Sequence, residues 1–494
     1  MEKLYNNVTK NICTSLYEPY QVDGCKWMLE REMDEGMFYD TNVSKGGILA
    51  DEVGLGKTLM SICMIVGNPK PKTLILLPKS LIHQWKEQIG KFTSNVNITI
   101  VESNSIIDEN INGVFLMSQS LINSKNTIIG NSPAHKITWD RIIIDEAHIL
   151  RNNKSKMFHA CCMLNTDIRW ALTATPIVNR MTDFVHIMSW FNVSQFLCQT
   201  EKERVASKFI LRRTKQDVAM YNEALILPDC EVNVKHVPFN SIDEKKMYID
   251  VFTQERKKML NGKNKTITDL LEHLLRVRQL CIHPQLYLDG MSKKRNIDCG
   301  DWLKPVTKLE CLIDDLKKQP NNEKTLIFCQ FIKEMDIYEE RLKKEGYNIV
   351  RLDGSMNIEE RSIVIARFKK ITEVNVFLIQ INTGGQGINL QNANHIYIMS
   401  PSWNPAIEHQ AIGRCHRTGQ KKKVYVTKYV ISSFDKDIPF IEENMMKLQE
   451  KKKKIIADIL KDERIINDGT HYHYDTDDCH NIKILFNLSL MNKV

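Results

Sequence analysis

The sequence lacks the features that would place the chain in a membrane or in an oxidising compartment. Among its 494 residues no apolar run is long enough to cross a bilayer, and no hydrophobic signal-peptide segment opens the chain. The 13 cysteines are scattered singly, apart from the Cys161-Cys162 pair, and no C-x-x-C spacing occurs. We therefore expect an intracellular protein that has no membrane partner, with free thiols and without structural disulfides or a structural zinc ion.

A strong excess of one charge is also absent. The formal net charge is +8, with 43% hydrophobic and 26% charged residues, which is typical of a globular protein. This mild basic excess permits a polyanionic partner without requiring one. The length exceeds what one hydrophobic core usually supports, so two or three domains are expected.

The stretch from Gly46 to Met60, GGILADEVGLGKTLM, has the residue types of a phosphate-binding loop. A short apolar strand leads into a turn with Gly54 and Gly56, and Lys57 and Thr58 then open an apolar helix. Glycines let backbone N–H groups close on phosphate oxygens, a lysine reaches the outer phosphates, and a threonine hydroxyl binds Mg²⁺. This order predicts nucleotide binding at the loop.

The loop departs from the common pattern at its first position, where Asp51 replaces the usual glycine or alanine. The alternative is an ordinary glycine turn with a surface lysine. A strand before the turn and a helix after it favour phosphate binding.

An acidic pair, Asp145 and Glu146, follows an apolar strand in RIIIDEAHILRN. An aspartate in this position can hold Mg²⁺ through water, and the glutamate can orient or deprotonate the water that attacks a γ-phosphate. Carboxylates at strand ends also serve as caps of the next helix. The phosphate loop about 90 residues upstream favours the catalytic interpretation.

Apolar runs of strand length alternate with helical patterns over the first 200 residues, which indicates a parallel sheet covered on both faces. Both the loop and the acidic pair then fall at the carboxyl ends of strands, where such sheets bind ligands. The pattern restarts near residue 324. The predicted strands lie at residues 48–50, 73–77, 114–117, 141–144, 170–172, 324–329, 348–352, 376–381, 395–399 and 424–429.

The second α/β segment has no phosphate loop, but it carries the arginine-rich stretch QAIGRCHRTGQ. Arg414 and Arg417 lie three residues apart and so face the same way on a helix. Arginine neutralises the charge that develops on a transferred phosphoryl group. The alternative is that either arginine is solvated or paired with a nearby acid.

Several other candidates have ordinary structural explanations. Gln21 alone reads as a helix-surface amide, and Thr173 and Thr175 as turn caps. The lysine run 451–454 reads as a solvated helix face that could also rest on a phosphate backbone. Metal binding is disfavoured both at Cys281 with His283 and in the tail that holds His471, His473, Cys479 and His480.

Together the ordered motifs resemble those of the Swi/Snf family of superfamily-two helicase-like ATPases, including the DEAH-box stretch. The resemblance covers residues 16 to 465 and rests on PYQVDGCKWM, GGILADEVGLGKT, LLPKSLIHQW, IIIDEAHILRN, LTATPIVN, LIFCQF, NTGGQGINLQNA, SWNP and QAIGRCHRTGQ. LLRVRQLCIHP looks most similar to the repair and transcription-termination branch, although the ring-type zinc insertion common there is missing.

The resemblance implies an α/β fold with two RecA-like parallel-sheet lobes in tandem and helical insertions between them. The expected divisions are a tail (1–15), lobe 1 (16–200), helical protrusions and a linker that include Lys215 (201–305), lobe 2 (306–440), a brace helix (441–465) and a C-terminal tail (466–494).

The resemblance also implies roles for individual residues, with ATP and Mg²⁺ as cofactors. Adenine and phosphates would be held by Gln21, Gly54, Gly56, Lys57, Thr58 and Gly387, and Mg²⁺ by Thr58 and Asp145. Glu146 would activate water, and Arg414 and Arg417 would be arginine fingers. Thr173 and Thr175 would couple nucleotide state to DNA grip, and DNA would be contacted by Lys79, Ser118, Gln330, Asn382 and Trp403.

The implied function is that of a monomeric, ATP-dependent translocase on double-stranded DNA that remodels protein–DNA complexes, with chromatin or the transcription machinery as partners. The implied location is the nucleus, or the virion or viral factory for a viral protein. Two alternatives stay open: an RNA-dependent ATPase that releases transcripts, and a catalytically silent DNA-binding scaffold.

Overall fold

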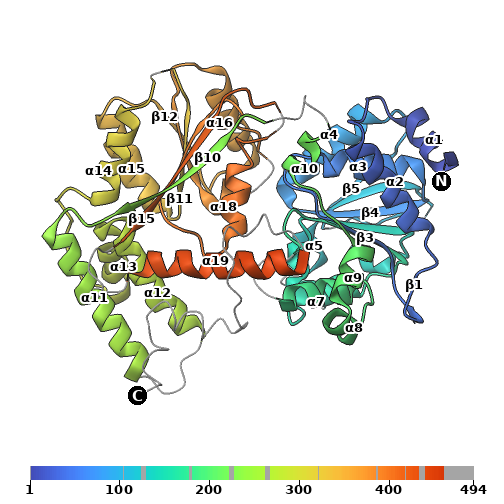
Figure 1. Ribbon diagram of the computed structural model, residues 1–494, viewed down its shortest axis with the longest axis horizontal. Coiled ribbons are helices and arrows are strands. Elements are labelled where there is room, and N and C mark those ends of the chain that lie inside the picture. Colours follow the sequence, from blue (N-terminus) through green and yellow to red (C-terminus); the bar gives the residue numbers. More distant parts are fainter. Residues whose placement is uncertain are drawn as a thin grey trace. The chain divides into compact units, whose positions relative to one another are not determined.

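The computed structural model describes residues 2–460 except 104, 109, 124–128, 177–180, 222–226, 262–266, 321, 385–387, 418 and 433–439. These residues form two compact units. Unit 1 comprises the described part of Met1–Leu227 with the end of the last helix from Ile455, and unit 2 comprises the described part of Pro228–Lys454. Figure 1 labels many of the elements in both.

Unit 1 is built on a seven-stranded, wholly parallel sheet in the order β5-β6-β4-β7-β8-β3-β9. Its inner strands are buried on both faces, as expected for apolar runs in a parallel sheet. The strands are β3 (Lys45–Leu49), β4 (Lys72–Leu77), β5 (Ile98–Val101), β6 (Gly113–Ser118), β7 (Arg141–Asp145), β8 (Ile168–Leu172) and β9 (Ile210–Leu211), and β1 (Met37–Phe38) and β2 (Thr41–Asn42) form a separate hairpin.

Helices cover both faces of this sheet (Figure 1). On each face the helices and strands bury a separate cluster of apolar side chains. One face carries α1 (Glu2–Asn11), α2 (Tyr20–Met33), α3 (Lys57–Gly67) and α4 (Ile82–Phe92). The other carries α5 (Gln119–Ile122), α6 (Lys156–Cys162), α7 (Met181–Trp190), α8 (Gln195–Thr200) and α9 (Lys202–Phe209). Short 3₁₀ turns occur at Lys79–Leu81, Pro133–Lys136 and Ala147–Arg151, and α10 (Lys215–Ala219) follows β9.

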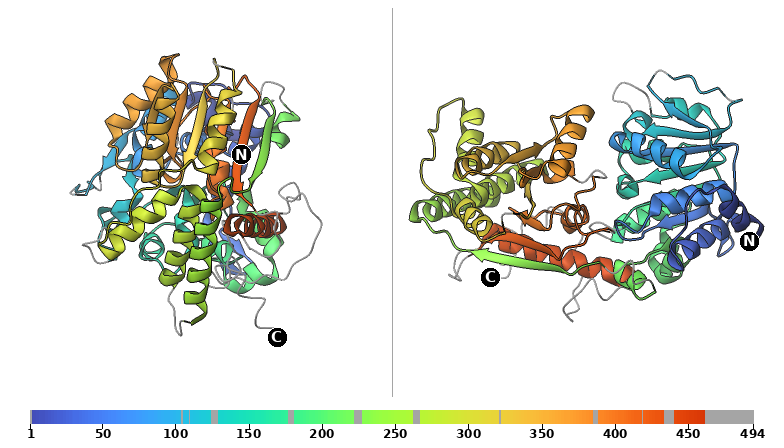
Figure 2. Two further views of the ribbon diagram at one scale, coloured as in Figure 1. Left: turned by 90° about the vertical axis from the view of Figure 1, so that its left-hand side faces the viewer. Right: turned by 90° about the horizontal axis from the view of Figure 1, so that it is seen from above.

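Unit 2 has a six-stranded parallel sheet in the order β10-β15-β14-β11-β13-β12. The strands are β10 (Cys230–Val237), β11 (Thr325–Cys329), β12 (Ile349–Leu352), β13 (Val376–Gln380), β14 (His395–Ile398) and β15 (Val424–Ile431). Figure 2 shows β10 beside β15, although the two are nearly 200 residues apart in the chain.

The helices of unit 2 again form two layers. α14 (Thr307–Lys317) and α15 (Ile332–Lys344) pack on one face, and α16 (Ile358–Lys370) and α18 (Pro405–Ile412) on the other. A further cluster joins α11 (Ile242–Asn261) and α12 (Ile267–Ile282) to the start of α19 (Ile441–Leu460). The remaining helices are α13 (Pro284–Arg295) and α17 (Ile381–Gly384).

The two parallel-sheet units confirm the expected fold class, with two differences in detail. The predicted N-terminal tail contains α1, which buries Val8 against α3, where a Cβ on Gly67 would lie 2.7 Å from the valine methyl. The predicted helical segment 201–305 contains β9 and β10, which join the sheets of unit 1 and unit 2 respectively. The predicted C-terminal tail lies outside the described residues.

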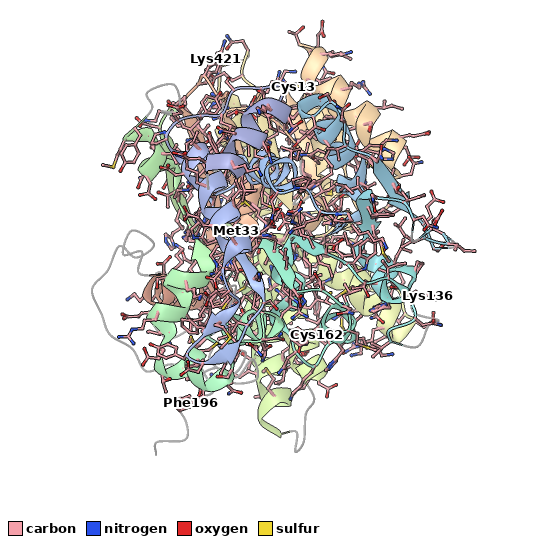
Figure 3. All side chains as sticks on the ribbon, turned by 90° about the vertical axis from the view of Figure 1, so that its right-hand side faces the viewer. Cys13, Met33, Lys136, Cys162, Phe196 and Lys421 are labelled. Atoms are coloured by element: carbon pink, nitrogen blue, oxygen red, sulfur yellow. The ribbon has the colours of Figure 1, made fainter. Side chains whose placement is uncertain are left out.

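Among the described residues, no helix is both long enough and apolar enough to span a bilayer. All twelve cysteines there are free. The two that are exposed, Cys13 and Cys162, lie well apart in Figure 3. The expectation of free thiols therefore holds for the part of the chain that the structure describes.

Candidate nucleotide site

The glycine turn between β3 and α3 has the backbone that a phosphate loop requires. Gly54 and Gly56 have φ of 99° and 86°, in the left-handed region that favours glycine. A Cβ at Gly56 would lie 2.5 Å from the side-chain nitrogen of Gln21. A side chain at this position would therefore both strain the turn and displace Gln21.

Lys57 begins α3, and its ammonium lies over the loop. Its Nζ donates to the backbone carbonyls of Asp51 (2.5 Å) and Glu52 (3.3 Å). Burial lowers the pKa of Lys57, while the carboxylates of Asp51, Glu146, Asp145 and Glu52 act in the opposite direction. The loop lysine and the acidic pair therefore share one electrostatic environment.

Asp145 ends β7 and is held by three groups. Trp85 Nε1 on α4 donates to Oδ2 (2.8 Å), the Glu146 amide donates to Oδ1 (2.9 Å), and Gln119 Nε2 donates to the backbone carbonyl (2.5 Å). Burial, and then the neighbouring Glu146 charge, raises the pKa of Asp145 to about 6. A nearby cation would favour its charged form.

Glu146 adopts a left-handed backbone, with φ 53° and ψ 52°, which is uncommon for a residue with a Cβ. It stands between the end of β7 and the 3₁₀ turn Ala147–Arg151. Its Oε2 lies 3.4 Å from His148 Nδ1. Because Asp145 ends β7, the glutamate that follows it lies at the carboxyl edge of the sheet beside Asp145.

These residues fit a nucleotide with Mg²⁺. The fit rests on the glycine cradle and on an oxygen donor set, since Thr58 in the first turn of α3 supplies a hydroxyl and Asp145 a carboxylate. Within the described ranges no group of three His, Cys, Asp or Glu could hold a metal. Mg²⁺ in phosphoryl-transfer sites takes one or two protein oxygens together with phosphate and water.

Gln21 is not the surface amide that its local sequence suggests. It is 3% exposed at the start of α2, and its Nε2 donates to the Tyr20 hydroxyl (3.1 Å) and to the carbonyl of Leu55 in the loop (3.4 Å). Its Oε1 accepts from the Tyr17 amide (3.0 Å). The side chain therefore lies against the phosphate loop with a fixed orientation.

The two threonines after β8 form a local turn. Thr173 is buried, and its hydroxyl accepts from the Thr175 amide (3.1 Å). The Thr173 amide donates to the Leu49 carbonyl (3.2 Å) at the end of β3. This geometry is that of a turn cap, and it joins the β8 end to the strand that leads into the phosphate loop.

In unit 2, Arg414 and Arg417 follow the end of α18. Arg414 is 5% exposed, and its carbonyl accepts from the Leu390 amide (2.9 Å). Arg417 is partly buried, and burial lowers its pKa. Its guanidinium makes no hydrogen bond or ion pair with any residue that the structure describes, so the explanation of pairing with an acid does not apply to it there.

The five candidate DNA-contact residues occupy different kinds of position. Lys79 lies just after β4 and Ser118 is the last residue of the adjacent strand β6 in unit 1, and only Lys79 is exposed. Gln330 and Asn382 follow the adjacent strands β11 and β13 in unit 2. In both units these side chains lie at a carboxyl edge of a sheet.

Trp403 contacts α19, the last helix that the structure describes. Lys452 on α19 places its Nζ 4.6 Å from the centre of the indole ring and donates to the Trp403 carbonyl (2.8 Å). Gly387, the remaining candidate for nucleotide binding, lies outside the described residues.

Sequence reasoning missed two side chains that hold this site. Trp85, which fixes Asp145, belongs to the motif LLPKSLIHQW but received no role of its own. Arg213 binds Asp51 through Nε to Oδ1 (3.0 Å) and Nη2 to Oδ2 (2.5 Å). No local pattern signals either contact, because the partners are 60 and 162 residues apart.

Comparison with family profiles gives two matches in chain order. The profile described as "SNF2-related domain" matches residues 20–201 and 191–286, and the one described as "Helicase conserved C-terminal domain" matches residues 307–419. The first of these alone covers more than half of the chain.

Individual relatives resemble most of this chain. A "Probable global transactivator" of Orgyia pseudotsugata multicapsid polyhedrosis virus is 27% identical over 88% of this chain and 89% of its own length. "ISWI chromatin-remodeling complex ATPase ISW1" of Saccharomyces cerevisiae is 30% identical over 83% of this chain. "Uncharacterized ATP-dependent helicase MG018" of Mycoplasma genitalium is 29% identical over 92% of this chain.

The yeast and mycoplasma relatives are much longer, since the matches cover 38% and 43% of their lengths. Among solved structures, the chain is similar to the "Sulfolobus solfataricus SWI2/SNF2 ATPase core in complex with dsDNA", with 25% identity over 93% of this chain and 98% of that one and a TM-score of 0.39. A TM-score of this size does not support a comparison of the two structures site by site.

Proposed function

We propose that this chain, which belongs to the SNF2-related family of helicase-like ATPases, uses ATP hydrolysis to move along double-stranded DNA and to remodel protein–DNA complexes. The observation that carries the proposal is geometric: the loop with Lys57 follows β3 and the acidic pair follows β7, so both lie at the same carboxyl edge of the parallel unit 1 sheet. Such an edge is where open parallel sheets bind nucleotides.

In the proposed reaction, the loop amides after Gly54 and the Lys57 ammonium bind the phosphates of ATP. Thr58 and Asp145 hold Mg²⁺, which supplies charge neutralisation when bound. Glu146 orients the attacking water and accepts its proton. The rigid support of Asp145 by Trp85 keeps the carboxylate in place.

Unit 2 is proposed to supply Arg414 and Arg417 to the γ-phosphate when the two units close on ATP. The absence of a partner for the Arg417 guanidinium among the described residues supports this role, because a partly buried cation that lacks an acid is available for an anionic ligand. Thr173 and Thr175 are proposed to couple nucleotide state to DNA grip.

Double-stranded DNA is proposed to bind through its backbone at Lys79, Ser118, Gln330, Asn382 and Trp403. Backbone tracking predicts weak sequence preference and an affinity that falls steeply with salt. The name of the yeast relative, which mentions chromatin remodelling, supports this choice of partner. A monomer that acts in the nucleus, or in a viral factory, fits the same proposal.

The first test compares the ATPase rate without nucleic acid and with duplex DNA, single-stranded DNA and RNA. We expect the largest stimulation with duplex DNA, and we expect displacement of a third strand from a triplex as the duplex is tracked. Dominant stimulation by RNA would instead identify an RNA-dependent ATPase, and the absence of hydrolysis under all conditions would identify a silent scaffold.

A further inference from the structure

Arg213 joins the phosphate loop to the start of α2. It follows β9, and its guanidinium donates to the Asp51 carboxylate through both Nε and Nη2. The backbone amide of Arg213 also donates to Asp51 Oδ1 (3.0 Å). Asp51 is fully buried. Because a buried carboxylate needs hydrogen bonds and an opposite charge, this three-point contact fixes the first residue of the loop.

The same guanidinium reaches the residue that precedes Gln21. Its Nη1 donates to the Tyr20 carbonyl, and its carbon lies 5.5 Å from the centre of the Tyr20 ring. Tyr20 is 4% exposed and packs with Leu55 of the loop and Val218 of α10. Arg213 therefore holds Tyr20 through its backbone and its ring together.

Gly24 provides the space for this arrangement. A Cβ at this position would lie 2.6 Å from Nη2 of Arg213 and 2.6 Å from the sulfur of Met60. Gly24 lies within α2, where glycine costs helix stability relative to alanine. The contact with the arginine gives a physical reason for glycine here.

Tyr20 in turn orients the Gln21 amide, because its hydroxyl accepts from Nε2 (3.1 Å) while the Tyr17 amide donates to Oε1 (3.0 Å). An amide distinguishes adenine from guanine only if its donor and acceptor ends are fixed, since the two bases present opposite groups at position 6. The orientation of Gln21 is thus linked through Tyr20 to Arg213.

We propose that Arg213 is a positioning residue that sets base discrimination at the nucleotide site, by locking Tyr20 and Gln21 to the phosphate loop through Asp51. This inference rests on the proposed function, because it takes the loop to bind ATP and Gln21 to read its base. Arg213 should therefore affect the preference for adenine over guanine more than it affects the binding of the phosphates.

Arg213→Lys is the informative variant. Lysine keeps the positive charge beside Asp51, but it lacks the forked geometry that also reaches the Tyr20 carbonyl. Gly24→Ala tests the same contact without altering the arginine, since the new methyl group displaces the guanidinium. Gly90→Ala is the matched control, because a Cβ at this exposed position on α4 would meet nothing within 4 Å.

Dissociation constants are measured for Mg-ATP, Mg-GTP and inorganic tripolyphosphate by isothermal titration calorimetry, with circular dichroism to verify folding. We expect Arg213→Lys to weaken ATP binding about tenfold, while GTP and tripolyphosphate change by less than about threefold, as for loss of one oriented hydrogen bond. Gly24→Ala should shift the ATP-to-GTP ratio in the same direction, and Gly90→Ala should match the unaltered protein.

Equal weakening of ATP and tripolyphosphate would show that Arg213 supports only the loop, and an unchanged ATP-to-GTP ratio in both variants would also overturn the proposal. If Arg213→Lys does not fold, Gly24→Ala decides between these outcomes. Lys57→Ala tests the underlying site separately: unchanged ATP binding in that variant would remove the proposed nucleotide site itself, whatever Arg213 does.

Discussion

The two units have the same kind of sheet, but they place different chemistry at its carboxyl edge. Unit 1 presents a glycine turn, a lysine and two carboxylates there. In unit 2 the amide side chains of Gln330 and Asn382 lie at this edge, and two arginines follow α18. The fold is therefore not what assigns a role to each unit. Under the proposed function, the side chains at these positions assign it: those of unit 1 would hold phosphate and water, and those of unit 2 would neutralise charge.

The comparison is tested most severely by Glu146→Gln in unit 1. If Glu146 activates water, the variant should lose at least about a thousandfold in ATP turnover while it keeps ATP affinity, because the amide cannot accept the proton. Turnover is measured with a coupled phosphate assay and affinity by calorimetry. A variant with normal turnover would show that the base has been misassigned.

In unit 2, Arg417→Ala should reduce turnover about a hundredfold and change ATP affinity by less than about threefold, because the arginine is expected to act on charge that develops during transfer. Arg367→Ala, at an exposed arginine near the end of α16, is the control. If ATP affinity fell as much as turnover, Arg417 would bind ATP before the reaction rather than act during phosphoryl transfer. That result would contradict the proposed difference between the units.

Each unit also contains a fully buried ion pair, and the two should differ in strength. Glu32 binds Arg141 in unit 1 (2.5 Å), and Glu442 binds Lys308 in unit 2 (2.7 Å). Glu32→Gln should lower the free energy of unfolding by about 3–5 kcal/mol, since the arginine stays charged without its partner. Glu442→Gln should cost less, because a buried lysine can lose its proton.

Chemical denaturation followed by circular dichroism measures both losses. Glu340→Gln, which breaks the exposed pair with Lys344 on α15, should change stability by less than about 0.5 kcal/mol. Equal costs for the two buried pairs would show that the identity of the cation does not matter at these sites.

The smallest expected effect concerns pH. Burial raises the pKa of Glu334 in unit 2 to about 7, although the backbone amides of Phe331 and Gln330 and the charges of Lys308 and Arg278 act against the shift. The folded state therefore holds this proton more tightly than the unfolded state. The resulting stabilisation is present at low pH and is lost as pH rises from about 4.5 through about 7.

Glu334→Gln keeps an oxygen that can accept the two backbone amides at the start of α15, but it does not titrate. We expect the unaltered protein to lose about 2 kcal/mol of stability relative to this variant between pH 5 and pH 8. Asp145 contributes with the same sign in both proteins, so the difference isolates Glu334. Parallel stability curves would show that Glu334 is already ionised at low pH.

Much of the fold was predictable because buried strands in parallel sheets are short apolar runs, as at 73–77 and 141–144. Five strands were not predicted. Four of them lack this signal, namely β1, β2, β9 and β10. The fifth, β5 (Ile98–Val101), is an apolar run, but it is only four residues long and lies half-buried at a sheet edge. β10 has alternating polar residues and is largely exposed at a sheet edge, and β9 has only two residues. The sequences on either side of β9 and β10 have helical patterns, so neither strand is distinguished from its surroundings.

At the site, local order along the chain was enough to predict the loop and the acidic pair, because strand ends at one sheet edge converge. The loop and the acidic pair do lie in one environment. The supports were not predictable. Trp85 and Arg213 contact Asp145 and Asp51 only through the tertiary fold.

The left-handed backbone of Glu146 has a consequence for selection. A residue with a Cβ pays about 1 kcal/mol or more for this conformation, which glycine adopts freely. Glu146→Gly should therefore raise the thermal unfolding temperature while it removes turnover. Screens that select for thermostability alone would favour glycine at this position, and they would yield a variant that is more stable but inactive.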